Sequence, residues 1–120
     1  MAAMRRFKEL EVWKTATALS RSAYHLTLLE PLSGHFELRN QIRRAAISIP
    51  ANLAEGYGLG TRPQLVRCMR IALGSAYELN THLELVRDIG ICETDEIDRV
   101  IAVCSREIGL LIGTLRGLGG

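Results

Sequence analysis

Apolar residues recur along the chain at alternating spacings of four and three positions, which is the period of one face of an α-helix. These stripes are interrupted at Pro31, at the glycine-rich run 56–60 and at Gly90, where a backbone leaves a helix easily. The pattern therefore predicts helices over residues 8–29, 37–57, 62–89 and 95–117.

Residues near the helix ends refine this prediction. Pro50 lies inside the second helix, where a proline removes a backbone hydrogen bond, so we expect a kink there. The glycines of residues 56–60 are expected to end that helix. Thr61 and Gln64 have the spacing of a capping box at the start of the third helix, and Thr94 is expected to cap the fourth.

The connections between these helices are short, and no stretch alternates as a β-strand does. Short connections favour antiparallel neighbours, and the sustained 3.5-residue spacing favours left-handed packing. At 120 residues and 13.3 kDa, the chain has the size of a single domain spanning residues 1–120. We therefore expect an all-α fold, an antiparallel up-down-up-down four-helix bundle with left-handed packing.

The composition is that of a globular protein without a membrane partner. A hydrophobic share of 48% with 23% charged residues excludes a disordered or collagen-like chain. The longest charge-free run, residues 45–54, has half of the roughly 20 apolar residues that a spanning helix needs, and the first residues lack the apolar segment of a secretory signal. Three cysteines without a CxxC pair are typical of reduced thiols, so we expect a cytoplasmic protein.

The third predicted helix has a second stripe beside its core stripe, so it has two neighbours to contact. Both neighbours could belong to the same chain, or the second stripe could contact another copy. Its polar members are typical of a mixed subunit interface, and its glycine would allow two backbones to approach closely. The candidate subunit interface consists of Ile71, Gly74, Ser75, Glu78 and His82.

The second predicted helix has a polar ribbon on one flank of its apolar stripe. Asparagine, serine and glutamate are poor choices for a solvated position in the middle of a helix. If these residues are partly buried, they form a structural network that fixes the register between helices; otherwise they are a surface for a ligand or partner. The ribbon consists of Gln41, Arg44, Ser48, Asn52 and Glu55.

Basic residues are concentrated between residues 39 and 70, where six arginines stand against Glu55 alone. Arginine forks onto phosphates and stacks on bases, so this surface could contact nucleic acid. A bundle could also simply pair a basic helix with an acidic one, and a high-GC coding bias would also raise the arginine content. The candidate nucleic-acid contacts are Arg39, Arg43, Arg44, Arg62, Arg67 and Arg70.

No set of residues has the spacing of a catalytic or metal site. A di-metal bundle needs Glu-x-x-His on two helices, whereas Glu78 and His82 are four apart and have no second copy. Neither Ser48 nor Ser75 has a histidine at a suggestive spacing, and the run 56–60 lacks the pattern of a phosphate-binding loop. We therefore predict no enzyme activity, no cofactor, no metal and no small-molecule substrate.

Three segments carry a resemblance to a known family: QIRRAAISIPANLAEG at residues 41–56, IALGS at residues 71–75 followed by Glu78 and Leu79, and FKELEVW at residues 7–13. They resemble the four-helix bundle proteins encoded in intervening sequences of bacterial large-subunit ribosomal RNA genes. The resemblance implies a cytoplasmic bundle that assembles as a ring, typically a pentamer, without an established enzymatic activity. That family is distantly similar to the accessory proteins of diversity-generating retroelements, which bind nucleic acid and a reverse transcriptase.

From the residues and the resemblance together, we expect a non-catalytic, homo-oligomeric interaction protein, most simply a pentamer. The alternative is an accessory factor that binds RNA or DNA through the arginine-rich surface of the second and third helices.

Overall fold

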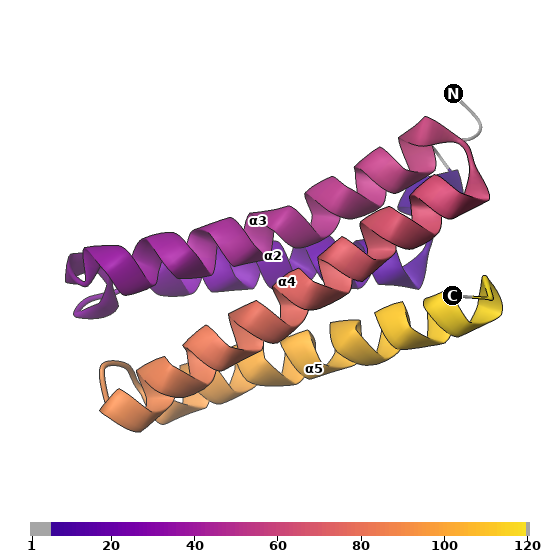
Figure 1. Ribbon diagram of the computed structural model, residues 1–120. Helices are drawn as coiled ribbons and strands as arrows, with labels where there is room; N and C mark the ends of the chain where they lie inside the picture. Colours follow the sequence, from indigo (N-terminus) through magenta and orange to yellow (C-terminus); the bar gives the residue numbers. More distant parts are fainter. Residues whose placement is uncertain (1–5, 120) are drawn as a thin grey trace.

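The structure is a computed structural model that describes residues 6–119, and this part of the chain is helical without any strand (Figure 1). The all-α prediction is confirmed. The elements are α2 (Glu11–Thr27), the 3-10 turn η1 (Leu32–Gly34), α3 (Phe36–Leu59), α4 (Arg62–Ile89) and α5 (Thr94–Gly117).

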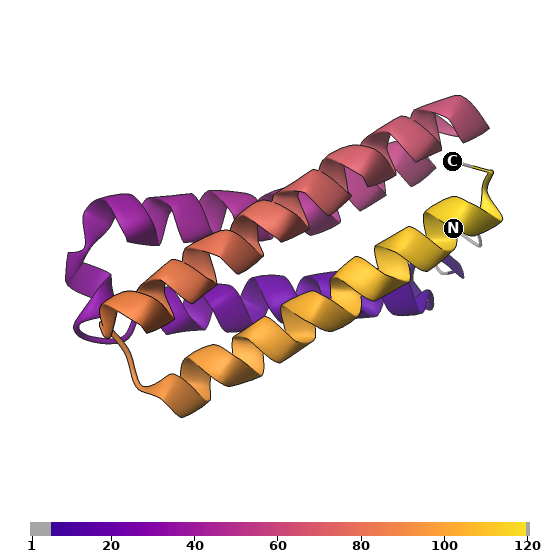
Figure 2. The same cartoon turned by 60° about the horizontal axis from the view of Figure 1, so that its bottom comes forward.

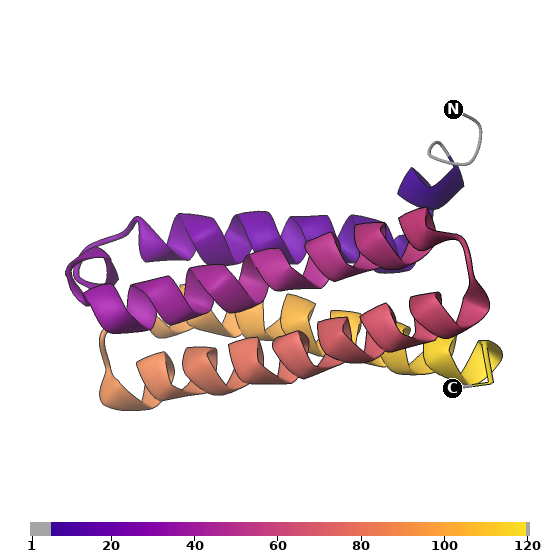
Figure 3. The ribbon, with the colours of Figure 1, turned by 45° about the horizontal axis from the view of Figure 1, so that its top comes forward.

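Each long helix packs against two others. The contact between α3 and α4 is the most extensive, α4 also packs on α5, and α2 packs on both α3 and α5. Figure 2 shows α5 on the near side of the molecule, and Figure 3 shows the α3–α4 connection at the opposite end from the α2–α3 and α4–α5 connections. At 1.5 Å per residue, the 28 residues of α4 span about 42 Å, which matches the 43 Å long axis of the molecule.

The apolar stripes of the sequence form the core. Leu19 of α2, Ile49 of α3, Leu79 and Leu83 of α4 and Leu111 of α5 have no exposed surface. Each such side chain contributes about 1.5–3 kcal/mol to folding through its removal from water. In the described part of the chain, no helix is long and apolar enough to cross a bilayer.

The end of α3 differs from the sequence prediction. The helix continues through Gly56 and Gly58 to Leu59, so the expectation that the whole glycine run ends it is wrong. Of the three glycines in this run, only Gly60 has a positive φ, +81°, and it turns the chain out of the helix. Gly56 has a different role, because a Cβ at this position would lie 2.9 Å from the Cβ of Cys68, so its lack of a side chain lets α3 and α4 approach closely.

The predicted caps have mixed outcomes. The amide of Gln64 donates to Thr61 Oγ1 at 3.4 Å, as the capping-box prediction requires, and the Gln64 side chain accepts from the same hydroxyl at 2.6 Å. The prediction that Thr94 caps α5 is wrong. Thr94 is the first helical residue, and the N-cap residue before it is Glu93, whose side chain makes no capping hydrogen bond.

Candidate functional site

The polar ribbon of α3 and the second stripe of α4 meet along one line. The hydroxyl oxygens of Ser48 and Ser75 lie 2.8 Å apart, and the guanidinium of Arg44 lies 3.8 Å from Glu78 Oε2. Two residue sets that the sequence presents separately are therefore joined. We call this surface the α3–α4 seam, and it consists of Gln41, Arg44, Ser48, Asn52, Ile71, Gly74, Ser75, Glu78 and His82.

Hydrogen bonds along α3 connect the ribbon internally. The amide nitrogen of Asn52 donates to the carbonyl oxygen of Ser48 at 2.8 Å and to its Oγ at 3.0 Å. Arg44 donates to the side chain of Gln41. Glu55 is exposed and has no hydrogen-bond or ion-pair partner within residues 6–119, so the network ends at Asn52.

The α4 side of the seam is only partly satisfied within one chain. Glu78 lies near both Arg44 and His82, with 4.0 Å between Glu78 Oε2 and His82 Nε2. The Arg44–Glu78 pair is exposed on both sides, and such pairs contribute about 0–1 kcal/mol. His82 Nε2 is buried and has no hydrogen-bond partner among the described residues, so the seam carries a buried polar atom that residues 6–119 leave without a hydrogen bond.

Apolar side chains continue the α4 stripe at both ends of its polar part. Ile71 is 41% exposed, Leu85 45% and Ile89 62%. Gly74 is exposed and a Cβ built there would meet nothing within 4 Å. Mixed apolar and polar positions around a bare stretch of backbone are typical of a surface that packs against another protein.

Two of the predicted nucleic-acid arginines face α2 and η1. Arg43 donates from Nε to Thr27 Oγ1 at 2.8 Å, and its guanidinium carbon lies 4.4 Å from the centre of the Tyr24 ring. Arg39 donates to the carbonyl oxygen of Ser33 at 2.9 Å and stacks on Phe36. These contacts tie α3 to the preceding part of the chain.

The other four predicted arginines lie elsewhere. Arg44 faces α4 in the seam, and Arg62 donates to the carbonyl oxygen of Leu118 at 2.8 Å near the C-terminal end of α5. Arg67 and Arg70 are exposed on α4. The structure therefore places Arg39 and Arg43 against η1 and α2, Arg44 in the seam and Arg62 beside the end of α5, and leaves Arg67 and Arg70 exposed on α4.

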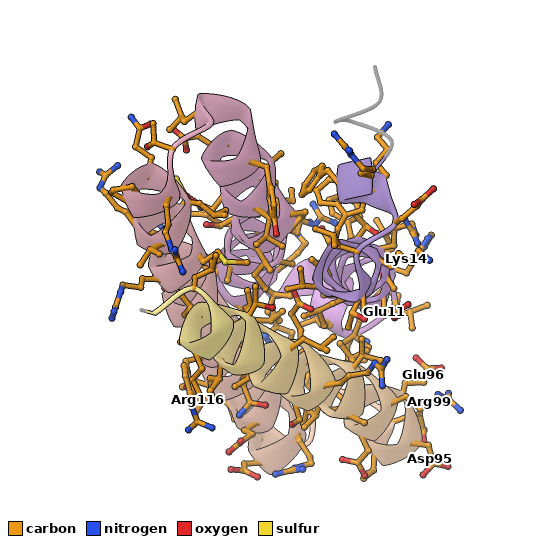
Figure 4. The ribbon with its side chains drawn as sticks, turned by 90° about the vertical axis from the view of Figure 1, so that its right-hand side faces the viewer. Glu11, Lys14, Asp95, Glu96, Arg99 and Arg116 are labelled. Atoms are coloured by element: carbon orange, nitrogen blue, oxygen red, sulfur yellow. The ribbon has the colours of Figure 1, made fainter. Side chains whose placement is uncertain are left out.

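Charged residues of α5 lie at the surface, with one exception. Figure 4 shows Asp95, Glu96 and Arg99 pointing outward from the first turns of α5. Glu107, in contrast, has no exposed surface, and burial raises the pKa of its carboxyl from 4.5 to about 8. Sequence reasoning did not select Glu107, although its spacing of four residues from Val103 and three from Leu110 places it on one helical face with these apolar residues and could have found it.

No group of three side chains that could hold a metal ion occurs in residues 6–119, and the three cysteines are free thiols. Cys104 is buried, and this burial, followed by the charge of Glu107, raises the pKa of its thiol to about 12. A thiol with this pKa stays protonated and is a poor nucleophile at neutral pH.

Comparison with known proteins shows similarity to one protein family and to solved structures. The family model for the 23S rRNA-intervening sequence protein matches residues 8–113. Among solved structures, the chain is similar to a protein of unknown function from the S23 ribosomal protein family of Bacteroides thetaiotaomicron, with a TM-score of 0.79, 23% identity and coverage of 88% of this chain and 95% of that chain. At this identity the structural likeness shows a shared fold, and neither match indicates a catalytic family. No curated protein matches the chain.

Proposed function

Because the chain belongs to the 23S rRNA-intervening sequence protein family, which confirms the resemblance of its sequence blocks, we propose that it is a non-catalytic interaction protein whose principal partner is itself. In this proposal the protomer is an antiparallel up-down-up-down bundle with left-handed packing, and copies assemble into a cytoplasmic ring, a pentamer as the resemblance implies.

The observation that carries this proposal is the incomplete state of the α3–α4 seam in one chain. Ile71, Leu85 and Ile89 are exposed on the stripe that also holds His82, whose Nε2 is buried without a hydrogen-bond partner among the residues described. A second protein surface would remove these apolar groups from water and could supply a hydrogen bond to the imidazole. A second copy of the chain is the simplest such partner, because homo-oligomers with closed symmetry are the commonest assemblies of soluble proteins.

Gly74 provides a test that separates assembly from folding. Replacing it with arginine adds a long side chain where the protomer has open space. The substitution also removes a glycine from the helix interior, and such a glycine lowers helix stability by about 1 kcal/mol. The Gly74→Arg protomer is therefore expected to keep its helical circular dichroism. Its mass by sedimentation velocity is expected to fall to that of a monomer, because the new side chain blocks a copy from packing on the seam.

Gly113 offers the matched control. It is an exposed glycine of α5, and a Cβ there also meets nothing within 4 Å. The Gly113→Arg variant is expected to retain the wild-type mass. If Gly74→Arg retains the wild-type oligomeric mass, the seam is not the interface and this assignment is wrong.

A second candidate function is binding of RNA or DNA, favoured by the exposed guanidinium of Arg67, close in sequence to Arg70 on the same helix. A ring would repeat these side chains around its axis and strengthen the attraction to a polyanion. Fluorescence anisotropy with a structured RNA at two salt concentrations tests this candidate. Arg67→Ala is expected to reduce the slope of log binding constant against log salt concentration by about 1, the value for one lost phosphate contact. Absence of binding at low salt would rule out this candidate function.

A further inference from the structure

We propose that Glu107 is a proton-binding site in the core that controls how α5 packs: α5 stays in the bundle while this carboxyl holds its proton, and it detaches when the proton is lost. This device belongs to the protomer, so it does not depend on the proposed assembly.

The first support is the complete enclosure of the carboxyl group. Glu107 has no exposed surface, and neither Oε1 nor Oε2 has a hydrogen-bond partner within the described residues. An ionised carboxylate in such a place lacks both water and a compensating donor, so the neutral form is strongly favoured. With a pKa of about 8, the group holds its proton at neutral pH and releases it under mildly alkaline conditions.

The second support is that no neighbouring group compensates the negative charge of an ionised Glu107 carboxylate. On its own helix, Cys104 is the titratable group coupled to Glu107; its thiol donates to the carbonyl oxygen of Ala76 at 3.3 Å and stays protonated. Burial is the sole cause of the raised Glu107 pKa, so no charged side chain of α2 or α4 shifts it.

The charged groups of the two helices that contact α5 have other surroundings. On α2, Glu11 lies at the surface 3.5 Å from Arg106, and Lys14, Arg21 and His25 are exposed. On α4, Arg62 donates to the carbonyl oxygen of Leu118 and Glu84 accepts from Asn80. The remaining charged groups of α4 lie at the surface or in the seam: Arg67, Arg70, Glu78, His82, Arg87 and Asp88. Ionisation of Glu107 would therefore leave a single uncompensated charge between helices.

The third support is the way α5 is attached. It packs on α4 and α2, and Figure 2 shows it on the near side of the bundle. Between its first turns and the end of α2 lies an open groove of about 640 Å³, lined in part by Leu26, Val100 and Val103. The extensive α3–α4 contact does not involve α5, so α5 can leave while α3 and α4 remain packed.

Hydrogen exchange followed by mass spectrometry tests the proposal. Exchange of α5 amides is measured between about pH 6 and about pH 8, and an unstructured peptide gives the intrinsic exchange rate for correction. The opening equilibrium constant of α5 is expected to rise about tenfold per pH unit, because opening releases one proton. The α5 amides are also expected to open more readily than those of α3. Glu107→Gln, which cannot ionise, is expected to remove the pH dependence, and Glu107→Met is expected to do the same if the glutamine variant folds poorly.

Glu9→Gln is the matched control, because Glu9 is an exposed carboxylate and its loss should leave the wild-type pH dependence unchanged. Two results would overturn the proposal. One is a pH dependence in wild type that persists in both Glu107 variants. The other is an equal opening equilibrium for α5 and α3 at every pH, because α5 would then not be a separate unit.

Discussion

Ser48 of α3 and Ser75 of α4 share a hydrogen bond of 2.8 Å between their hydroxyl oxygens. A one-residue shift of either helix would turn one hydroxyl away from the other, so this contact favours a single register of the two helices. We therefore expect the ribbon to have a structural role from Gln41 to Asn52, while Glu55, which faces solvent, is available for a partner.

Asn52 and Glu55 provide the direct test of this division. Asn52→Ala removes two hydrogen bonds from the half-buried network and is expected to cost about 1 kcal/mol, which lowers Tm by about 4 °C in a domain of this size. Glu55→Ala is expected to leave Tm unchanged. Differential scanning calorimetry at one fixed protomer concentration measures both, since assembly makes Tm concentration-dependent. Equal losses for the two variants would contradict the division.

Gly56 and Gly58 are expected to respond in opposite directions to the same substitution. The Cβ of Gly56→Ala would lie 2.9 Å from Cys68 Cβ and 3.3 Å from Leu65 Cα, and such overpacking costs about 1–3 kcal/mol. Gly58→Ala meets nothing within 4 Å and replaces a helical glycine, so it is expected to stabilise by up to about 1 kcal/mol. Urea denaturation measures both changes. A neutral Gly56→Ala variant would show that α3 and α4 do not approach each other as closely as described.

Glu107 makes the stability of the protein depend on pH. Its pKa rises from 4.5 in the unfolded chain to about 8 in the fold, so between these values the folded state holds a proton that the unfolded state has lost. The contribution of Glu107 to the free energy of unfolding is therefore most favourable below pH 4.5. It falls by about 1.4 kcal/mol per pH unit as pH rises and levels off above about pH 8.

Substitution of Glu107 is expected to remove this slope. Below pH 4.5, Glu107→Met should be more stable than wild type by about 1–3 kcal/mol, because it no longer buries an unpartnered polar group. The difference should widen by about 1.4 kcal/mol per pH unit as pH rises toward 8. Denaturation curves at several pH values give both quantities. If wild type and the methionine variant show the same slope, Glu107 is not the group responsible.

Sequence reasoning located the four long helices well because their stripes repeat without interruption, but it placed single side chains less well. Arg43 and Arg44 are adjacent in the sequence, yet one contacts α2 and the other faces α4, since successive residues lie about 100° apart around a helix. The burial of Glu107 depends on the rotation of α5 about its axis. The apolar stripe of α5 in the sequence is too narrow to fix that rotation, so it does not decide which of two neighbouring positions faces the core.

The most direct test of the central claim, that the seam holds copies of the chain together, is the mass of the wild-type protein in solution. Sedimentation velocity at micromolar concentration is expected to give one species at a multiple of the 13.3 kDa protomer, five times that mass for the ring. A single species at 13.3 kDa at every micromolar concentration tested would contradict the claim.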